Sequence, residues 1–416
     1  MNKLNKKNII PLITKFSSSL LSIYTPYYFI NQQLSQEYGL LILNIATFKI
    51  FIGWLISSNK KLLIYSERFI FPSFLKFNLI LNFFIIIGYF IIFSITNSNN
   101  YILGLLSLPI VLESILLSFL ERFGDISLSV FIKSSLIFFS GFLAKIISDY
   151  SSNEILKTWI LAYTFLIFLI FFYWKLFLFK NEKNLNSFDQ NPSKNENLNL
   201  NFKNFIKLSY SYWLGELDVI LSTESPILIC GMIFGPVMTS KYSLIKTIIK
   251  SPCLIQGFTN PYSGYKLREM FSLKIPFHKI KNYFYKQTFY NSIGALIIFL
   301  CIFLFLKIYQ IYDFKFLGQI INSLKDYETA ILFSSLAFVI VALMGPITNI
   351  LLCMKKQKIL GFITFTSSLL GIPIQFIISK FFGFEGFLLS TTFSAMVSNI
   401  ASRIIFERFP YKRGPQ

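Results

Sequence analysis

Twelve apolar stretches dominate this chain of 416 residues and restrict it to one class of fold. Each stretch, at about 20 residues, is long enough to cross the hydrocarbon core of a membrane as a helix. Charged residues make up 14% of the sequence, against about 25% in soluble domains. The sequence therefore predicts an all-α integral membrane protein with twelve transmembrane helices. The predicted spans are 9–30, 39–57, 77–96, 101–120, 126–147, 158–179, 209–234, 236–258, 287–306, 327–354, 358–379 and 384–402.

The distribution of basic residues supports this count and gives an orientation. If the N-terminus is cytoplasmic, the inner loops, termini and adjoining span ends carry 27 of the 39 Lys and Arg residues. The outer loops then carry 5, and seven lie inside spans. Cytoplasmic loops are enriched in Lys and Arg, so an error of one span would scramble this alternation. We predict that both termini are cytoplasmic. The net charge of +20 has the same explanation, and no nucleic-acid partner is expected.

A polar, Asn-rich stretch at 180–203 divides the chain into six plus six spans. Its composition is typical of a linker with little structure, and six plus six spans are typical of duplicated transporter halves. We therefore predict lobes at 1–180 and 204–416, joined by a cytoplasmic linker at 181–203. A weak repeat supports the duplication, because aligning Gly39 with Ser240 also aligns Lys49 with Lys250.

Lysines inside the spans are the strongest indication of function. A cation at the centre of a membrane helix costs roughly 2.5–3.5 kcal/mol, and such residues usually face a cavity or a partner. The sequence therefore indicates a cationic cavity that binds an anion. Its candidate binding residues are Lys49, Lys246, Lys250, Lys15 and Lys133. Two further lysines, Lys145 and Lys241, lie near the predicted outer interface.

A structural interpretation of the same lysines stays open. Lys246 and Lys250 are four residues apart and share one face of a helix. They could bind an anion, pair with Asp218 or Glu224, or extend to the membrane surface. Asp218, Glu224 and Glu113 are in turn candidates for ion pairs or for coupling to an ion gradient.

Proline and glycine mark candidate hinges. Proline removes a helix hydrogen bond and bends the helix, which a bundle that changes shape can use. The candidates are Gly345, Pro346 and Pro252.

Soluble enzyme chemistry has no motif in the sequence. No HExxH, P-loop or nucleophile elbow is present, so we predict a non-enzyme without cofactor or metal site. The four cysteines are isolated in apolar runs, which favours packing over a disulfide or a metal centre.

Three segments carry a resemblance to a known family. The run ICGMIFGPVMTSKYSLIKTI from Ile229 resembles the flexible entry to span eight of Wzx-type polysaccharide (O-antigen) flippases. Gln36-Glu37-Tyr38-Gly39 resembles the matching motif of the first half, and the run from Gly345 to Asn399 follows the closing pattern of that family. These flippases belong to the multidrug, oligosaccharidyl-lipid and polysaccharide exporter (MOP) superfamily. Ser240 departs from the glycine expected at its position.

The resemblance implies both a fold and a function. The fold is a MATE-like V-shaped bundle of two six-helix lobes. The function is alternating-access transport of an isoprenoid-diphosphate-linked oligosaccharide, an O-antigen or other surface polysaccharide unit, across the bacterial inner (cytoplasmic) membrane. The partners implied are this substrate, membrane lipids, H⁺ or Na⁺ as coupling ion, and a polysaccharide polymerase with its chain-length machinery.

The sequence leaves two alternative functions open. A membrane polysaccharide polymerase or lipid-linked glycosyltransferase also has many spans, but it generally needs a large outer loop for catalysis. The longest predicted outer loop is 307–326, with Asp313 and Asp326 as its only acids. A drug or small-solute antiporter of the same superfamily would need a cavity suited to cations, whereas this one is predicted to be basic.

Overall fold

The computed structural model describes residues 35–50, 202–311 and 324–408, together with Leu161–Ile170 and short runs or single positions between 80 and 172. All regular structure in these residues is helical, which confirms the predicted all-α class. Four described stretches are long and apolar enough to cross a membrane, as in a multi-pass membrane protein. The first predicted span, most of the third, fourth and fifth, and part of the sixth lie outside the described residues, so the count of twelve stays a prediction.

The chain divides into two compact units. One contains residues 1–18 and 52–213, and the other contains 19–51 and 214–416. The second unit thus includes residues 39–51 of the second predicted span together with 214–416, and it contains most of the described residues. Its helices are α2 (Ser35–Phe48), α9 (Phe202–Lys250), η3 (Ser251–Cys253), α10 (Leu254–Ser272), α11 (Phe277–Ile311), α13 (Glu328–Leu343), α14 (Ile347–Cys353), α15 (Gln357–Ser390) and α16 (Phe393–Arg408).

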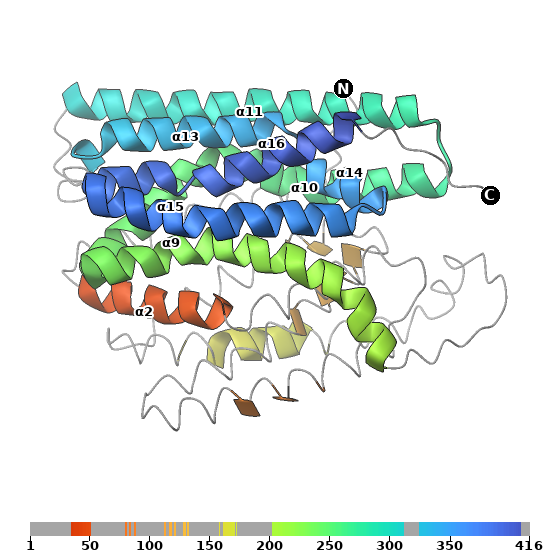
Figure 1. Cartoon of the computed structure of the whole chain (residues 1–416), viewed down its shortest axis with the longest axis horizontal. Coiled ribbons are helices and arrows are strands. Elements are labelled where there is room, and N and C mark those ends of the chain that lie inside the picture. The colour runs from red at the N-terminus through yellow and green to blue at the C-terminus, as the bar shows by residue number, and fades with distance from the viewer. Residues whose placement is uncertain are drawn as a thin grey trace. The chain divides into compact units, whose positions relative to one another are not determined.

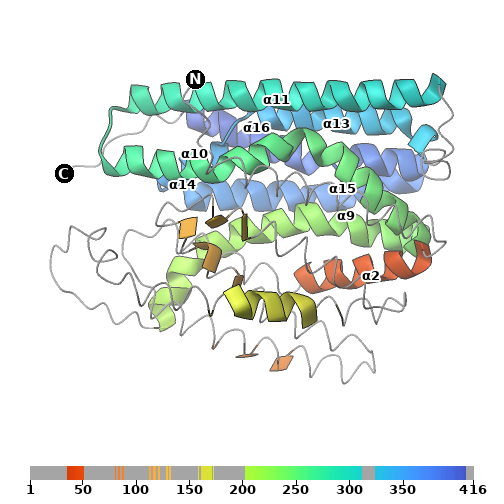
Figure 2. The same cartoon turned by 180° about the vertical axis from the view of Figure 1, so that it is seen from behind.

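Helix α9 is two helical segments joined by a sharp turn at Gly235. The glycine has φ 81° and ψ 176°, a conformation that residues with a Cβ rarely adopt. Pro236 follows and starts the second segment, where its missing N–H is no loss. Figure 2 shows the chain doubling back at this point. The predicted turn between spans seven and eight is therefore confirmed.

Helix α2 packs on this turn with unusually close approach. A Cβ on Gly39 would lie 1.9 Å from the Pro236 carbonyl oxygen, and one on Gly231 would lie 2.3 Å from a methyl carbon of Leu43. Small residues allow membrane helices to approach closely, which is a main source of their packing energy. Two of the three segments that carry the resemblance, at Gly39 and at Gly235-Pro236, therefore contact each other.

The remaining helices form a bundle in which α11 packs on α10 and α13, and α15 packs on α16 and α13. Helices α10 and α11 extend beyond the predicted spans: helical structure continues from 258 to Ser272 and begins at Phe277, ten residues before 287. Hydropathy marks only the part of a helix inside the hydrocarbon, whereas backbone hydrogen bonding propagates further. The predicted outer turn between spans eleven and twelve is present at Gly383, where φ is 62°.

Helices α15 and α16 meet along small side chains. Ser394, Ser398 and Ser402 are spaced by four residues on α16 and are buried. A Cβ on Gly371 of α15 would lie 2.8 Å from the Ser394 Cβ. The spacing follows the small-xxx-small pattern of membrane helix pairs, so hydroxyls replace large apolar groups at this interface.

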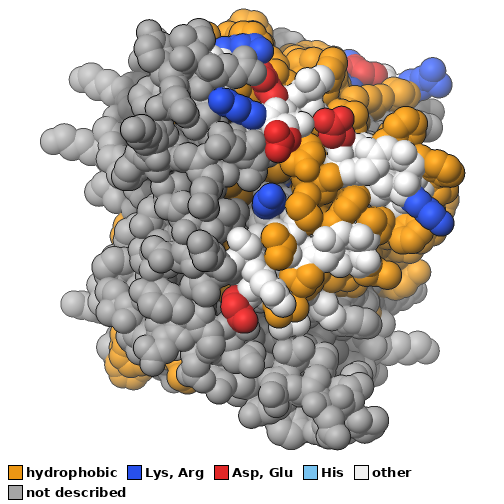
Figure 3. Space-filling model, turned by 90° about the vertical axis from the view of Figure 1, so that its left-hand side faces the viewer, with side chains coloured by type: hydrophobic (Ala, Val, Ile, Leu, Met, Phe, Trp, Pro, Cys, Tyr) orange, Lys and Arg blue, Asp and Glu red, His pale blue; other side chains and the backbone are white. Residues whose placement is uncertain are grey.

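A mostly apolar core surrounds the C-terminal part of α9. Phe384 and Phe387 from α15 pack edge-to-face against Phe234 and Tyr242, at ring-centroid distances of 4.9 to 5.9 Å. At the left-hand end in Figure 1, where α9 turns and α13 begins, charged side chains of both signs lie among apolar ones (Figure 3). One pair there is Lys307–Glu328, at 2.9 Å.

Candidate functional site

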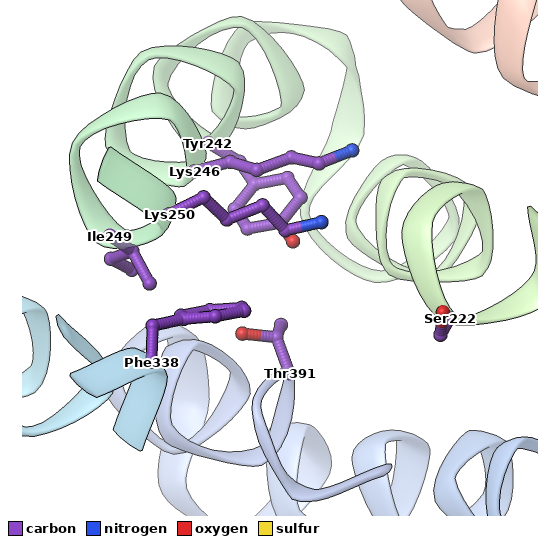
Figure 4. A pocket seen from close by; sticks show the side chains of 7 residues that line it. All are labelled: Ser222, Tyr242, Lys246, Ile249, Lys250, Phe338 and Thr391. Carbon is purple, nitrogen blue, oxygen red and sulfur yellow. The ribbon is translucent and has the colours of Figure 1, made fainter. Parts of the chain in front are cut away.

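The candidate site lies where the second segment of α9 faces its first segment and α13. Lys246 and Lys250 project from the second segment, one helical turn apart, and their side chains extend side by side in Figure 4. The prediction that they share a face is confirmed. They line a small pocket with room for little more than one water molecule. The other lining residues are Ser222, Tyr242, Ile249, Phe338 and Thr391.

Lys49 and Glu224 form an ion pair beside this pocket. Lys49 follows the last turn of α2, and its Nζ donates to the Glu224 Oε1 at 3.1 Å. The Glu224 side chain is 10% exposed and that of Lys49 is 45% exposed. A carboxylate this buried needs a charged or hydrogen-bonding partner, and α2 supplies one from outside the C-terminal half of the chain.

Lys246 is held by the backbone of the first α9 segment. Its Nζ donates to the Thr223 carbonyl oxygen at 2.6 Å. Pro226 lies three residues further along the same helix and has no N–H, so it leaves the carbonyl group four residues before it, that of Ser222, without its helix bond. Polar side chains often bond backbone carbonyls near such breaks in membrane helices, and Lys246 bonds the carbonyl next to this one.

Lys250 has a different environment from the other two lysines. Its Nζ lies 5.9 Å from the centre of the Phe338 ring, which is at the outer limit of a cation–π contact. Glu224 interacts electrostatically with Lys49, Lys246 and Lys250 together. Among the described residues of this cluster, one carboxylate therefore interacts with three lysine side chains.

The other predicted site residues are distributed as follows. Lys15 and Lys133 lie outside the described residues, as does the side chain of Asp218 on α9. Glu113 belongs to the other compact unit, where it accepts a hydrogen bond from the buried Tyr163 hydroxyl. Glu113 and Glu224 are thus in separate units.

The predicted hinge residues coincide with helix breaks. Pro252 lies in the short 3₁₀ helix η3, between α9 and α10. Gly345 has φ 70° and separates α13 from α14, with Pro346 at the N-cap of α14. The Gly345 carbonyl oxygen accepts hydrogen bonds from the Ile347 backbone N–H at 2.8 Å and from the Gln256 Nε2 at 3.0 Å.

Several site features are absent from the sequence prediction. Phe338 and Thr391 are far from α9 in sequence and reach the pocket only through tertiary packing. The Thr223 carbonyl is a backbone group, and Pro226 is the only sequence signal that could have indicated it. Within the described residues, no group of His, Cys, Asp and Glu side chains could hold a metal ion.

Comparison with known proteins identifies the fold as that of MATE transporters. The point-mutated MATE transporter VcmN of Vibrio cholerae matches with a TM-score of 0.61 and 12% identity, covering 97% of this chain and 95% of that chain. A multidrug resistance MATE family transporter of the MOP superfamily matches in its outward-facing conformation, with a TM-score of 0.52, 13% identity and coverage of 96% and 87%. A multidrug resistance MATE family transporter of the MOP superfamily in the inward-facing conformation matches with a TM-score of 0.58 and 14% identity, covering 94% of this chain and 96% of that chain.

Sequence comparison gives no closer relative. No protein-family model matches the sequence, and no curated protein matches it. At identities of 12 to 14% the likeness establishes the fold alone. The predicted MATE-like bundle is therefore confirmed as a fold, while the Wzx-type specificity inferred from the motifs stays a prediction.

Proposed function

We propose that this protein is an alternating-access flippase that moves an isoprenoid-diphosphate-linked oligosaccharide across the bacterial inner membrane. The observation that carries the proposal is the lysine cluster of α2 and α9, with Lys49, Lys246 and Lys250 around Glu224. The MATE transporter fold supports a transporter rather than an enzyme.

The charge of the cluster favours an anionic cargo. Each ammonium group in a membrane helix is costly unless it has a partner, and this cluster has three lysines for one carboxylate. A diphosphate diester carries two negative charges. Lysine suits phosphate oxygens because its three N–H donors impose no single geometry. Lys250 is the proposed principal contact, since its side chain lines the pocket and its ammonium lies near the Phe338 ring.

In this proposal the chain comprises lobes at 1–180 and 204–416, and the isoprenoid chain of the cargo stays in the bilayer while its sugar diphosphate is bound by lysines. Lys15 and Lys133 are the proposed binding lysines of the first lobe. Movement would occur at the helix breaks of Pro252 and Gly345–Pro346, where regular backbone bonding is interrupted. The linker at 181–203 and both termini would be cytoplasmic.

Coupling to H⁺ or Na⁺ would use carboxylates of the two halves, with Glu113 hydrogen-bonded to Tyr163 in one and Glu224, with Asp218, in the other. The further proposed partners are membrane lipids and the polymerase and chain-length machinery of polysaccharide assembly.

A drug or small-solute antiporter is the second candidate, because the fold alone is equally consistent with it. Buried carboxylates such as Glu224 suit a cationic drug. Against it stand the three lysines around that carboxylate. A polymerase or glycosyltransferase is not favoured, because the fold matched is that of transporters.

The proposal is tested in proteoliposomes containing the purified protein. The probe is a fluorescent oligosaccharide linked to an isoprenoid through diphosphate, and dithionite bleaching measures how much reaches the other leaflet. We expect rapid exchange of this probe, no exchange of the same lipid lacking the diphosphate, and no transport of the cation ethidium.

Two results would reject the proposal. Ethidium transport without movement of the diphosphate lipid would establish the antiporter, and equal movement of both lipids would mean that the diphosphate is not recognised. Lys266→Ala is the matched control, since this lysine is exposed on α10 and pairs with Glu269 at 2.8 Å.

A further inference from the structure

Glu224 lies at the centre of the lysine cluster and not at its edge. Its carboxylate bonds Lys49 at 3.1 Å and also interacts electrostatically with Lys246 and Lys250. Lysines from two helical segments, α2 and the second part of α9, therefore converge on a single internal anion. An external anion that contacts the same ammonium groups has to share this space with the carboxylate.

We propose that Glu224 is an internal counter-anion. In the resting site its carboxylate is paired with the Lys49 ammonium group, and this ion pair must break before an anionic ligand binds. The inference rests on the proposed function, and it adds a self-inhibiting contact to that site. The ligand class is a diphosphate, whose oxygens accept hydrogen bonds from an ammonium group as a carboxylate does. Ligand and Glu224 therefore compete for one donor.

The unequal exposure of the two partners indicates which one moves. Lys49 is 45% exposed, whereas Glu224 is 10% exposed. The lysine side chain is long and flexible, so its ammonium can leave the carboxylate for another anion without a change in α2. Lys246 is less free, because the Thr223 carbonyl holds it at 2.6 Å.

The size of the pocket supports a site that is closed at rest. It lies beside Lys246 and Lys250 and has room for little more than one water molecule. A diphosphate does not fit unless neighbouring groups withdraw. Release of the Lys49–Glu224 pair would provide a third ammonium group and remove one of the contacts between the α2 region and the first segment of α9.

When Glu224 competes with the ligand, the apparent affinity for the ligand falls in proportion to the fraction of molecules in which the site is free. A site that is free about one-tenth of the time binds about tenfold more weakly than one that is always free. Neutralising Glu224 should therefore raise the affinity for diphosphate by about tenfold. A purely positioning role would give the opposite result, since Lys49 would lose the group that orients it.

The first experiment measures binding of sodium diphosphate to the detergent-purified protein by isothermal titration calorimetry. The variant is Glu224→Gln and the matched control is Glu216→Gln, which alters another buried carboxylate of α9 two helical turns away. We expect the dissociation constant to fall about tenfold for Glu224→Gln and to stay at the wild-type value for Glu216→Gln. Unchanged or weaker binding by Glu224→Gln overturns the inference.

The second experiment uses the wild-type protein and so does not depend on the folding of a variant. Dicyclohexylcarbodiimide labels carboxyl groups in apolar surroundings, and peptide mass spectrometry measures its attachment to Glu224. A carboxylate released from Lys49 takes up a proton more readily, so saturating diphosphate should increase labelling severalfold. Labelling that stays constant or decreases means that Glu224 keeps its partner, which contradicts the inference.

The two experiments separate this inference from the proposed function. If the diphosphate lipid is transported but neither affinity nor labelling changes as expected, the flippase stands and the internal counter-anion does not. If neither the wild type nor Glu224→Gln binds diphosphate and the lipid is not transported, the proposed function fails, and this inference with it.

Discussion

Two clusters in the second unit each join one glutamate to several basic side chains. They differ in the partners that surround these basic side chains. In the first cluster, Glu224 bonds Lys49 while Lys250 faces a pocket. In the second, Glu407 of α16 is bonded by Lys281 at 2.8 Å and by Arg403 at 2.9 Å. The Tyr285 hydroxyl donates to the same carboxylate.

Aromatic rings complete the second cluster. The Arg403 guanidinium lies 4.8 Å from the centre of the Phe284 ring and 5.1 Å from that of Tyr285, and Lys281 lies 5.7 Å from that of Phe406. Each cation therefore contacts both an acid and a π surface, which accounts for its charge. The cluster joins α11 to α16 and is structural. If the proposed function is right, a lysine is available to bind an anion only when it lines a pocket, as Lys250 does.

Lys250→Ala should have the largest effect of the substitutions that test this comparison. Removing one partner of a desolvated charged contact costs about 2–5 kcal/mol, so transport of the diphosphate lipid should fall on the order of 30-fold or more. Lys250→Arg should retain part of the activity because it keeps the charge. Transport by Lys250→Ala at the wild-type rate would make the two clusters functionally alike.

Lys246→Met should reduce both stability and transport. It removes the donor to the Thr223 carbonyl oxygen, and a hydrogen bond from a charged group contributes about 1.5–3 kcal/mol. We expect a lower melting temperature in detergent and slower flipping, with Lys241→Met, on the same α9 segment but outside the pocket, as the control. A fully stable variant would show that the carbonyl is satisfied in another way.

Arg403→Met should affect stability alone. It removes an ion pair and the ring contacts of the second cluster, together about 1–2 kcal/mol. The melting temperature should fall, while the transport rate per folded molecule should equal that of the wild type. A specific loss of transport would show that this cluster also contributes to function, which would break the distinction between the two.

The smallest expected effect is a pH dependence at the second cluster. Partial burial raises the pKa of the Glu407 carboxyl, but hydrogen bonds from Lys281 and Tyr285 and the charge of Arg403 outweigh it, so the pKa lies below the usual 4.5. The stabilisation is therefore complete above pH 4.5 and is lost as the pH falls through the lower folded value. Below that pH, the wild-type melting temperature should approach that of Glu407→Gln.

The sequence by itself determined the membrane class, the four described span-forming stretches and the positions of the main breaks. Length and hydropathy define spans because every backbone N–H and C=O group in the hydrocarbon core must be hydrogen-bonded within the protein, which a helix achieves. Gly235-Pro236, Gly345 and Gly383 were predictable because their chemistry interrupts a helix locally. The shared face of Lys246 and Lys250 followed from helical spacing alone.

Tertiary structure alone decided which charges meet. Nothing local links Lys49 to Glu224, which lie 175 residues apart in the chain, and nothing local distinguishes Lys250 from Lys246. The distinction depends on a carbonyl near Pro226 and on Phe338, which α13 brings to α9. Helix periodicity fixes the direction of a side chain on its own helix, whereas its partners depend on long-range packing that a single sequence does not encode in any local pattern.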